Sequence, residues 1–157
     1  MVTKLMTSRP KVGDVIEIPT QTGFAYAQYS HWNDRYGELI RVLPGVHKSR
    51  PTRWESLVGQ PEVFSTFTPL AKAVRDGHVS VVASVPVPSS AQSFPLMRAP
   101  GLLDASGNTV WWLWDGKQEW RTPQLTAEQQ RLSIREIVGL SVIADRVLNG
   151  WNPVQEV

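Results

Sequence analysis

The chain has 157 residues, of which 41% are hydrophobic and only 19% charged, and its formal net charge is +2. This composition predicts one packed domain, excludes a disordered chain, and gives no electrostatic argument for nucleic-acid binding. There are no cysteines, so disulfides, thiolate catalysis and cysteine-ligated zinc are excluded as well.

Residues 1–10 are predicted to form a flexible N-terminal tail, and residues 11–157 a single α+β domain. The first residues lack the apolar segment of a signal peptide. No stretch approaches the ~20 apolar residues that a membrane helix needs. We therefore expect a cytoplasmic protein that makes no contact with a membrane.

Three short strands are predicted between residues 12 and 43, because short apolar or alternating runs are separated there by turn residues. The stretch "FAYAQYS" shows the clearest alternation. The valines of 79–87 predict a further strand, whereas the proline-rich stretch that follows, up to residue 101, is expected to be a surface connection. Between these regions, short helical turns are expected at Ser56-Leu57 and from Phe64 to Val74. The best of them, "TPLAKAVRDG", is expected to be capped by Thr68.

Four tryptophans lie within residues 109–120: Trp111, Trp112, Trp114 and Trp120. The continuous apolar run followed by Asp115-Gly116 predicts a buried central strand and a tight hairpin turn. We expect these rings to be mainly core, with a ligand-stacking platform or a docking surface as the alternatives.

The C-terminal part is predicted to be helical. Thr126 with Gln129 matches a capping box, and a second box predicts a helix over 133–149, with an apolar face toward the sheet. Trp151 is expected to fold back on the last turn of this helix. Together these elements predict an α+β fold, in which a bent antiparallel sheet or small SH3-like barrel carries a packed C-terminal helix.

The chain contains no recognisable catalytic or metal-binding motif. Its three histidines, His31, His47 and His78, are not spaced as metal ligands, and no phosphate loop, nucleophile elbow or triad signature occurs. We therefore expect a protein that is not an enzyme and that uses neither a cofactor nor a metal.

Two predicted loops combine tryptophan, tyrosine and arginine, the residue types that most often anchor protein interfaces. Such residues also suit single-stranded nucleic acid, where rings stack on bases and basic groups hold phosphates. A third interpretation is that the rings are half-buried and the charges form a solvated rim. The candidate partner-binding residues are Trp32, Arg35 and Tyr36 in "HWNDRYGE", and Arg50, Arg53 and Trp54 in "VHKSRPTRW".

The stretches "KVGDVIEIP…GFAYAQYS" and "YGELIRVLPG" resemble the N-terminal strands of the immunity protein 26 family of bacterial polymorphic toxin systems. The stretch from "WWLWDGKQEW" to "GWNP" is similar to that family's C-terminal pattern of an aromatic strand, a turn and a helix ending in Gly-Trp. The resemblance covers residues 11–43 and 110–153. The best-matched positions are Asp14, Pro19, Gly150 and Trp151, and Gln28 stands where the family usually has glycine.

The resemblance implies a non-enzymatic cytoplasmic protein that binds a cognate toxin domain and blocks it. Because the chain is slightly basic, we expect it to bind the toxin through complementary shape, aromatic anchors or local charge, rather than through a negative potential over its whole surface. The alternative is a small-barrel module that binds nucleic acid or peptide through the same aromatic and basic side chains.

Overall fold

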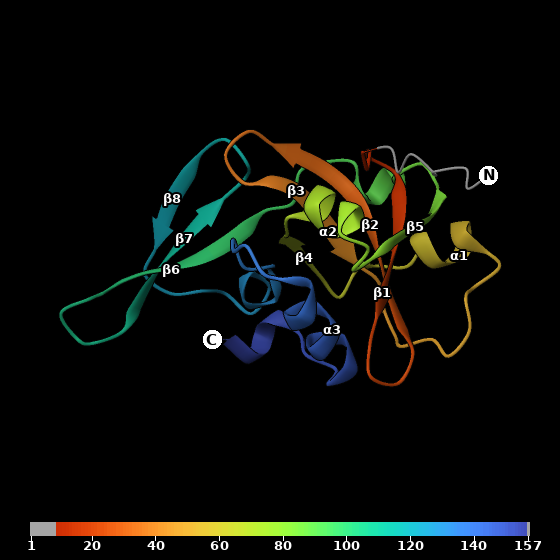
Figure 1. Ribbon diagram of the computed structural model, residues 1–157. Helices are drawn as coiled ribbons and strands as arrows, with labels where there is room; N and C mark the ends of the chain where they lie inside the picture. Colours follow the sequence, from red (N-terminus) through yellow and green to blue (C-terminus); the bar gives the residue numbers. More distant parts are fainter. Residues whose placement is uncertain (1–8, 157) are drawn as a thin grey trace, which may run out of the picture.

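The computed structural model describes residues 9–156 and contains two open antiparallel sheets (Figure 1). The larger sheet, sheet A, has the strand order β4-β3-β2-β1-β5, and the smaller one, sheet B, has the order β6-β7-β8. The predicted α+β class is confirmed, and neither sheet closes into a barrel. The predicted tail falls almost entirely on residues outside the described range.

Sheet A consists of β1 (Asp14–Pro19), β2 (Phe24–Asn33), β3 (Gly37–Val42), β4 (Phe64–Phe67) and β5 (Ser80–Ser84). Sheet B consists of β6 (Met97–Leu103), β7 (Thr109–Trp114) and β8 (Glu119–Thr122). The helices are α1 (Trp54–Val58), α2 (Leu70–Arg75) and α3 (Leu140–Leu148), and 3₁₀ turns occupy Ser89–Ala91, Gln129–Arg131 and Pro153–Glu156. Sheet B lies beside sheet A, and the loop between β6 and β7 points away from the rest of the molecule (Figure 1).

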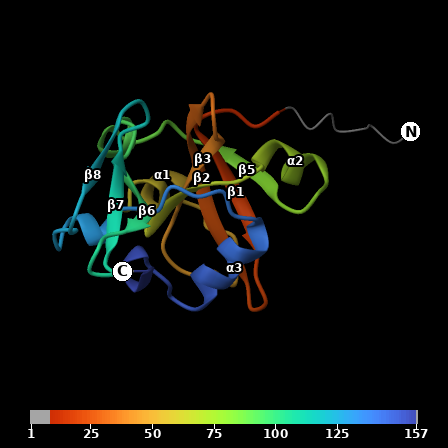
Figure 2. The ribbon, with the colours of Figure 1, turned by 90° about the vertical axis from the view of Figure 1, so that its left-hand side faces the viewer.

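Both faces of sheet A are covered, which the alternation of its strands explains. Ile16 and Ala27 are cross-strand partners on the face that packs against α2 and α3, and we call this the helix face. Val15 and Tyr26 point to the opposite face, where they meet α1, and we call this the loop face. Figure 2 shows α2 and α3 on the same side of sheet A.

The predicted helix over 133–149 is wrong in its first half, since α3 begins only at Leu140. Residues 133–138 are extended and form a connector that hydrogen-bonds to both sheets. The Arg98 N–H donates to the Ser133 carbonyl (3.0 Å), and the Val138 N–H donates to the Phe67 carbonyl (2.9 Å). Free backbone groups at the edges of two sheets therefore outcompete helical bonding in this segment, a contact that local spacing cannot reveal.

Two further predictions are wrong, in the segments that form β4 and β6. Residues 64–67, expected as helical, form an edge strand, and the expected proline-rich surface connection contains β6. Pro100 is tolerated in β6 because the register with β7 shifts directly after it. The helix in "TPLAKAVRDG" is confirmed as α2, although Thr68 makes no cap, and Pro69 occupies the capping position.

Several local predictions at the C-terminal end are confirmed. The Thr126 hydroxyl accepts from the Gln129 N–H (3.1 Å), and the Gln129 side chain accepts from the Thr126 N–H (2.9 Å), as a capping box requires. The Trp151 N–H donates to the Arg146 carbonyl (2.9 Å), so the chain folds back on the last turn of α3. No helix within residues 9–156 is long and apolar enough to cross a membrane.

Candidate functional site

The six residues predicted to bind a partner lie at two ends of strand β2. Trp32, Arg35 and Tyr36 are at its C-terminal end, in and beside the turn to β3. Arg50 and Trp54 lie near its beginning, where His47 and Phe24 exchange backbone hydrogen bonds of 2.8 Å. From Phe24 to Trp32 the strand rises by roughly 26 Å, at about 3.3 Å per residue. The six residues therefore form two separate surfaces.

The first surface is a cleft of about 440 Å³ between the β2–β3 turn and the β7–β8 turn, which we call the turn cleft. At its rim the side chain of Trp32 is 52% exposed, and its Nε1 donates to Asp34 Oδ1 (3.0 Å). The cleft is lined by Trp32, Asn33, Asp34, Arg35, Phe94, Trp114, Asp115, Gly116 and Lys117.

The floor of the turn cleft is aromatic and continuous with the core between the sheets. The Trp114 ring packs edge-on against Tyr36 and Phe94, with centroid distances of 5.3 and 5.2 Å. Tyr36 also stacks on Phe67. Tyr36 is thus part of the supporting core, whereas Trp32 and Arg35 are exposed.

The two turns that form the cleft are tied to each other. Asn33 Oδ1 accepts from the N–H groups of Arg35 (2.9 Å) and Tyr36 (3.0 Å), and Asn33 Nδ2 donates to the Gly116 carbonyl (3.4 Å). Gly116 has φ +98°, as expected for the turn, and a Cβ there would collide with the Phe94 ring. The walls of the cleft are therefore fixed relative to one another.

The second surface is a cavity of about 470 Å³ beside the loop face, which we call the loop cavity. Its most constrained side chain is Arg50, which forms a two-pronged ion pair with the buried Glu17: Nε to Oε2 is 2.8 Å and Nη2 to Oε1 is 3.0 Å. The cavity is lined by His47, Ser49, Arg50, Pro51, Thr52, Arg53, Ser56, Leu57 and Gln60.

The ion pair beneath the loop cavity has clear electrostatic consequences. The hydrogen bonds from Arg50 hold the pKa of Glu17 below its usual range, against the opposing effect of burial. The Tyr26 hydroxyl also donates to Glu17 Oε2 (2.8 Å). Burial, with that bond to the carboxylate, raises the pKa of Tyr26. Trp54 packs edge-on against Tyr26 at 5.3 Å and is only partly exposed.

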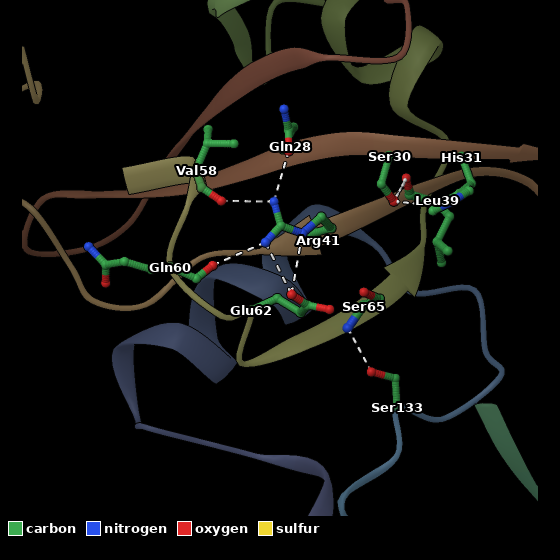
Figure 3. Close-up of polar contacts among 10 residues, drawn as sticks. All are labelled: Gln28, Ser30, His31, Leu39, Arg41, Val58, Gln60, Glu62, Ser65 and Ser133. Carbon is green, nitrogen blue, oxygen red and sulfur yellow. Dashed lines mark hydrogen bonds and ion pairs between the residues drawn. The ribbon is translucent and has the colours of Figure 1, made fainter. Parts of the chain in front are cut away.

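A second polar network lies on the same face of sheet A and is centred on the buried Arg41 (Figure 3). Arg41 Nη1 donates to Gln28 Oε1 (2.8 Å) and to the Val58 carbonyl (3.0 Å). Nη2 donates to the Gln60 carbonyl (3.0 Å) and to Glu62 Oε2 (3.1 Å). Gln28 and Arg41 are cross-strand partners, so Gln28 has a structural role in this network.

The prediction that the tryptophans of the hairpin are mainly core is correct for Trp114, which is 6% exposed. Trp111 and Trp112 are only half-buried, and Trp120 is 43% exposed. The physical reason is that sheet B is an open sheet of three strands with β8 at one edge, so these rings are not covered on all sides. Arginine side chains lie over three of the four rings, including that of the buried Trp114. The guanidinium carbons of Arg98, Arg121 and Arg135 lie 4.6, 5.0 and 5.3 Å from the centroids of Trp111, Trp112 and Trp114.

One serine–histidine contact is present, between Ser30 Oγ and His31 Nδ1 at 3.0 Å (Figure 3). Ser30 is buried and also donates to the Leu39 carbonyl (3.3 Å), and His31 Nε2 lies 2.8 Å from the Gln92 carbonyl. The hydroxyl is buried, and no carboxylate within residues 9–156 accepts a hydrogen bond from the imidazole, so the pair lacks the arrangement of a catalytic dyad there. Residues 9–156 contain no group of three or more His, Asp or Glu side chains that could hold a metal ion.

No family model, curated protein or solved structure matches the chain. The resemblance to the immunity family therefore depends on the quoted residues alone.

Proposed function

We propose that this chain is a non-enzymatic immunity-type protein that binds a toxin domain in the bacterial cytoplasm and blocks it, with the turn cleft as the contact surface. The observation that supports this proposal best is the half-exposed Trp32 at the rim of a cleft with a fixed shape and an aromatic floor. Tryptophan and arginine beside a preformed hollow are typical of the residues that carry most of the energy of a protein interface.

The charges of the turn cleft favour recognition by shape rather than by a uniform field. Asp34 and Asp115 are both engaged within their own turns, since Asp34 accepts from Trp32 and Asp115 Oδ1 accepts from the Lys117 and Gln118 N–H groups. These backbone bonds lower the pKa of Asp115. Arg35 and Lys117 are exposed on the same rim, so both signs of charge are present.

The test uses the toxin domain encoded beside this gene. We expect the reading frame next to it to end in a variable C-terminal toxin domain, and the purified domain to form a stoichiometric complex with this chain in calorimetric titration. Trp32→Ala should weaken that complex by about 2 kcal/mol, or roughly 30-fold. Trp120→Ala, which removes an exposed tryptophan outside the cleft, is the matched control and should leave the affinity unchanged.

Two results would contradict the proposal. The absence of a complex between the wild-type chain and the neighbouring toxin domain would overturn the function. A complex that Trp32→Ala and Trp120→Ala weaken equally would overturn the assignment of the turn cleft.

The nucleic-acid alternative has less support from the arrangement of side chains. Single-stranded nucleic acid is held by rings and basic groups that follow one another along the strand. Here the exposed ring of Trp32 has Arg35 and Lys117 near it, but Asp34 and Asp115 line the same cleft, and the basic residues of the loop cavity lie at the other end of β2. No single observation on either surface favours this second function.

A further inference from the structure

The loop face of sheet A buries charged and amide side chains, which are seldom buried unless other groups of the protein bind them. Glu17 and Arg41 are 8% and 2% exposed, and Gln28 is fully buried. Burying such groups costs free energy unless each finds a partner. Here the partners are supplied largely by the segments above the sheet, so the buried groups fix the conformation of those segments.

One wall of the loop cavity is fixed through Glu17. Its two oxygens hold Arg50, and the Tyr26 hydroxyl holds Glu17 in turn. The same wall is fixed at its beginning by the paired backbone bonds between His47 and Phe24. Gly23 permits this approach, because a Cβ at that position would collide with the His47 carbonyl.

The other wall is fixed through Arg41, which binds the carbonyls of Val58 and Gln60 at 3.0 Å each (Figure 3). These residues end α1 and follow it, and Leu57 and Gln60 line the cavity. The irregular segment 47–53 and the segment 56–60, which is the end of α1 and the residues after it, are thus held in place by two separate buried networks. A cavity with walls fixed in this way loses little entropy when a ligand enters.

The groups that this cavity presents to solvent are hydrogen-bond donors and cations. Arg50 Nη1 and the Arg53 guanidinium make no hydrogen bond with any of the described residues, and Lys48 is exposed next to them. Of the nearby carboxylates, Glu17 and Glu62 are already bound by Arg50 and Arg41. Glu55, in the first turn of α1, is exposed and does not line the cavity. Ser49, Thr52 and Ser56 add hydroxyl groups to the lining.

We propose that the loop cavity binds carboxylates of an acidic segment of the partner protein. It would then be a second contact surface, in addition to the turn cleft and separate from it. This inference rests on the proposed function, because it names the chemistry of the partner. The planar fork of arginine matches the geometry of a carboxylate. A protein segment is favoured over single-stranded nucleic acid because the rings at the cavity are already packed against another ring: His47 and Trp54 both lie edge-on to Tyr26 at 5.3 Å.

The test measures binding of a fluorescein-labelled deca-glutamate peptide to the full chain by fluorescence anisotropy at low salt. Wild type should bind the peptide, and binding should weaken as salt is added. Arg53→Glu should weaken it about fivefold or more, as expected when an exposed ion pair is replaced by repulsion. Arg131→Glu, at an exposed arginine outside the cavity with the same change in net charge, should leave binding within about twofold.

Three outcomes of the peptide experiment would overturn the inference: no binding by wild type, equal weakening by the two substitutions, or tighter binding of an oligothymidylate of the same length. Thermal unfolding monitored by circular dichroism checks that both variants are folded.

Binding measurements with the toxin domain distinguish a failure of this inference from a failure of the proposed function. A toxin complex whose affinity Arg53→Glu leaves unchanged overturns the inference and leaves the function standing. If no toxin complex forms, the proposed function is overturned, and the peptide experiment still decides whether the cavity recognises carboxylates.

Discussion

Each of the two sheets buries one arginine completely, and the two arginines are satisfied in different ways. In sheet A, Arg41 is bound by Gln28 and by the Glu62 carboxylate, as well as by two carbonyls. In sheet B, Arg98 is 0% exposed, and within residues 9–156 its acceptors are all neutral: the carbonyls of Gln130, Pro153 and Glu156 at 3.3, 2.6 and 3.4 Å. Its Nε has no partner among the described residues, and burial lowers the pKa of Arg98.

This difference shows which parts of the chain satisfy the buried arginine of each sheet. The Arg41 network lies within sheet A and the segment that directly precedes β4, so the buried arginine of sheet A is satisfied by residues close to the sheet in the chain. The Arg98 acceptors come from residues 32 to 58 positions later in the chain. Sheet B therefore depends on the C-terminal segment folding against it, and its tryptophans pack against arginine as well as against apolar groups.

The largest effect is expected at Trp114, where the two sheets share a core. The ring contacts Phe67 of sheet A and is nearly buried. Trp114→Ala should lower the free energy of unfolding by about 3–5 kcal/mol, measured by denaturant titration. Trp120→Ala, in the same hairpin but exposed, should change it by less than about 0.5 kcal/mol. Equal losses in the two variants would show that the sheets do not depend on a common core.

The next prediction compares the two buried arginines directly. Arg41→Met leaves Gln28 and the Val58 carbonyl without a donor in the interior, and should cost about 3 kcal/mol of unfolding free energy. Arg98→Met should cost less, about 1–2 kcal/mol, because two of its three acceptors, the carbonyls of Gln130 and Glu156, are only partly buried, so water can replace the guanidinium there and only the Pro153 carbonyl is left buried without its donor. A larger loss for Arg98→Met would contradict the proposed difference between the sheets.

The sequence predicted those elements whose determinants are local. The period-two alternation around Tyr26, the Asp115-Gly116 turn and the capping box at Thr126 each depend on a few adjacent residues, and all three are confirmed. The connector 133–138 could not be predicted, because its bonding partners Phe67 and Arg98 are distant in sequence. Local capping signals at Ser133 instead favoured a helix, and Ser133 Oγ accepts from the Ser65 N–H.

The candidate site could be predicted only in part, for a related reason. Trp32 and Arg35 are both exposed, but the turn predicted for both contains only Arg35, because strand β2 continues through Trp32 to Asn33. The pairing of Arg50 with Glu17 joins residues far apart in sequence, and no spacing rule indicates it. The contribution of Phe94 and Gly116 to the turn cleft likewise depends on how sheet B lies against the β2–β3 turn.

The dependence of stability on pH should also differ between variants of the two sheets. The pKa of Glu17 is lowered in the folded chain, so the stabilisation from its ion pair is fully present above the unfolded value of about 4.3 and is lost as pH falls through the folded value. Unfolding midpoints measured from pH 7 to pH 2 should fall less steeply for Glu17→Gln than for wild type. The carbonyls around Arg98 do not titrate, so Arg98→Met should keep the wild-type slope. Identical slopes for wild type and Glu17→Gln would contradict the assignment.

The smallest effect is expected at Arg121, on the exposed surface of sheet B. Its guanidinium lies 5.0 Å from the centre of the half-buried Trp112 ring and makes no hydrogen bond or ion pair with residues 9–156. Because one side of the stack is solvated, Arg121→Ala should cost only about 0.5–1 kcal/mol of unfolding free energy. The Trp112 ring should become more accessible in the folded state, which iodide quenching of tryptophan fluorescence would detect, with Arg131→Ala as the control. If Arg121→Ala changes neither quantity, the arginine does not cover the ring, and the packing of arginine on tryptophan in sheet B is limited to Arg98 and Arg135.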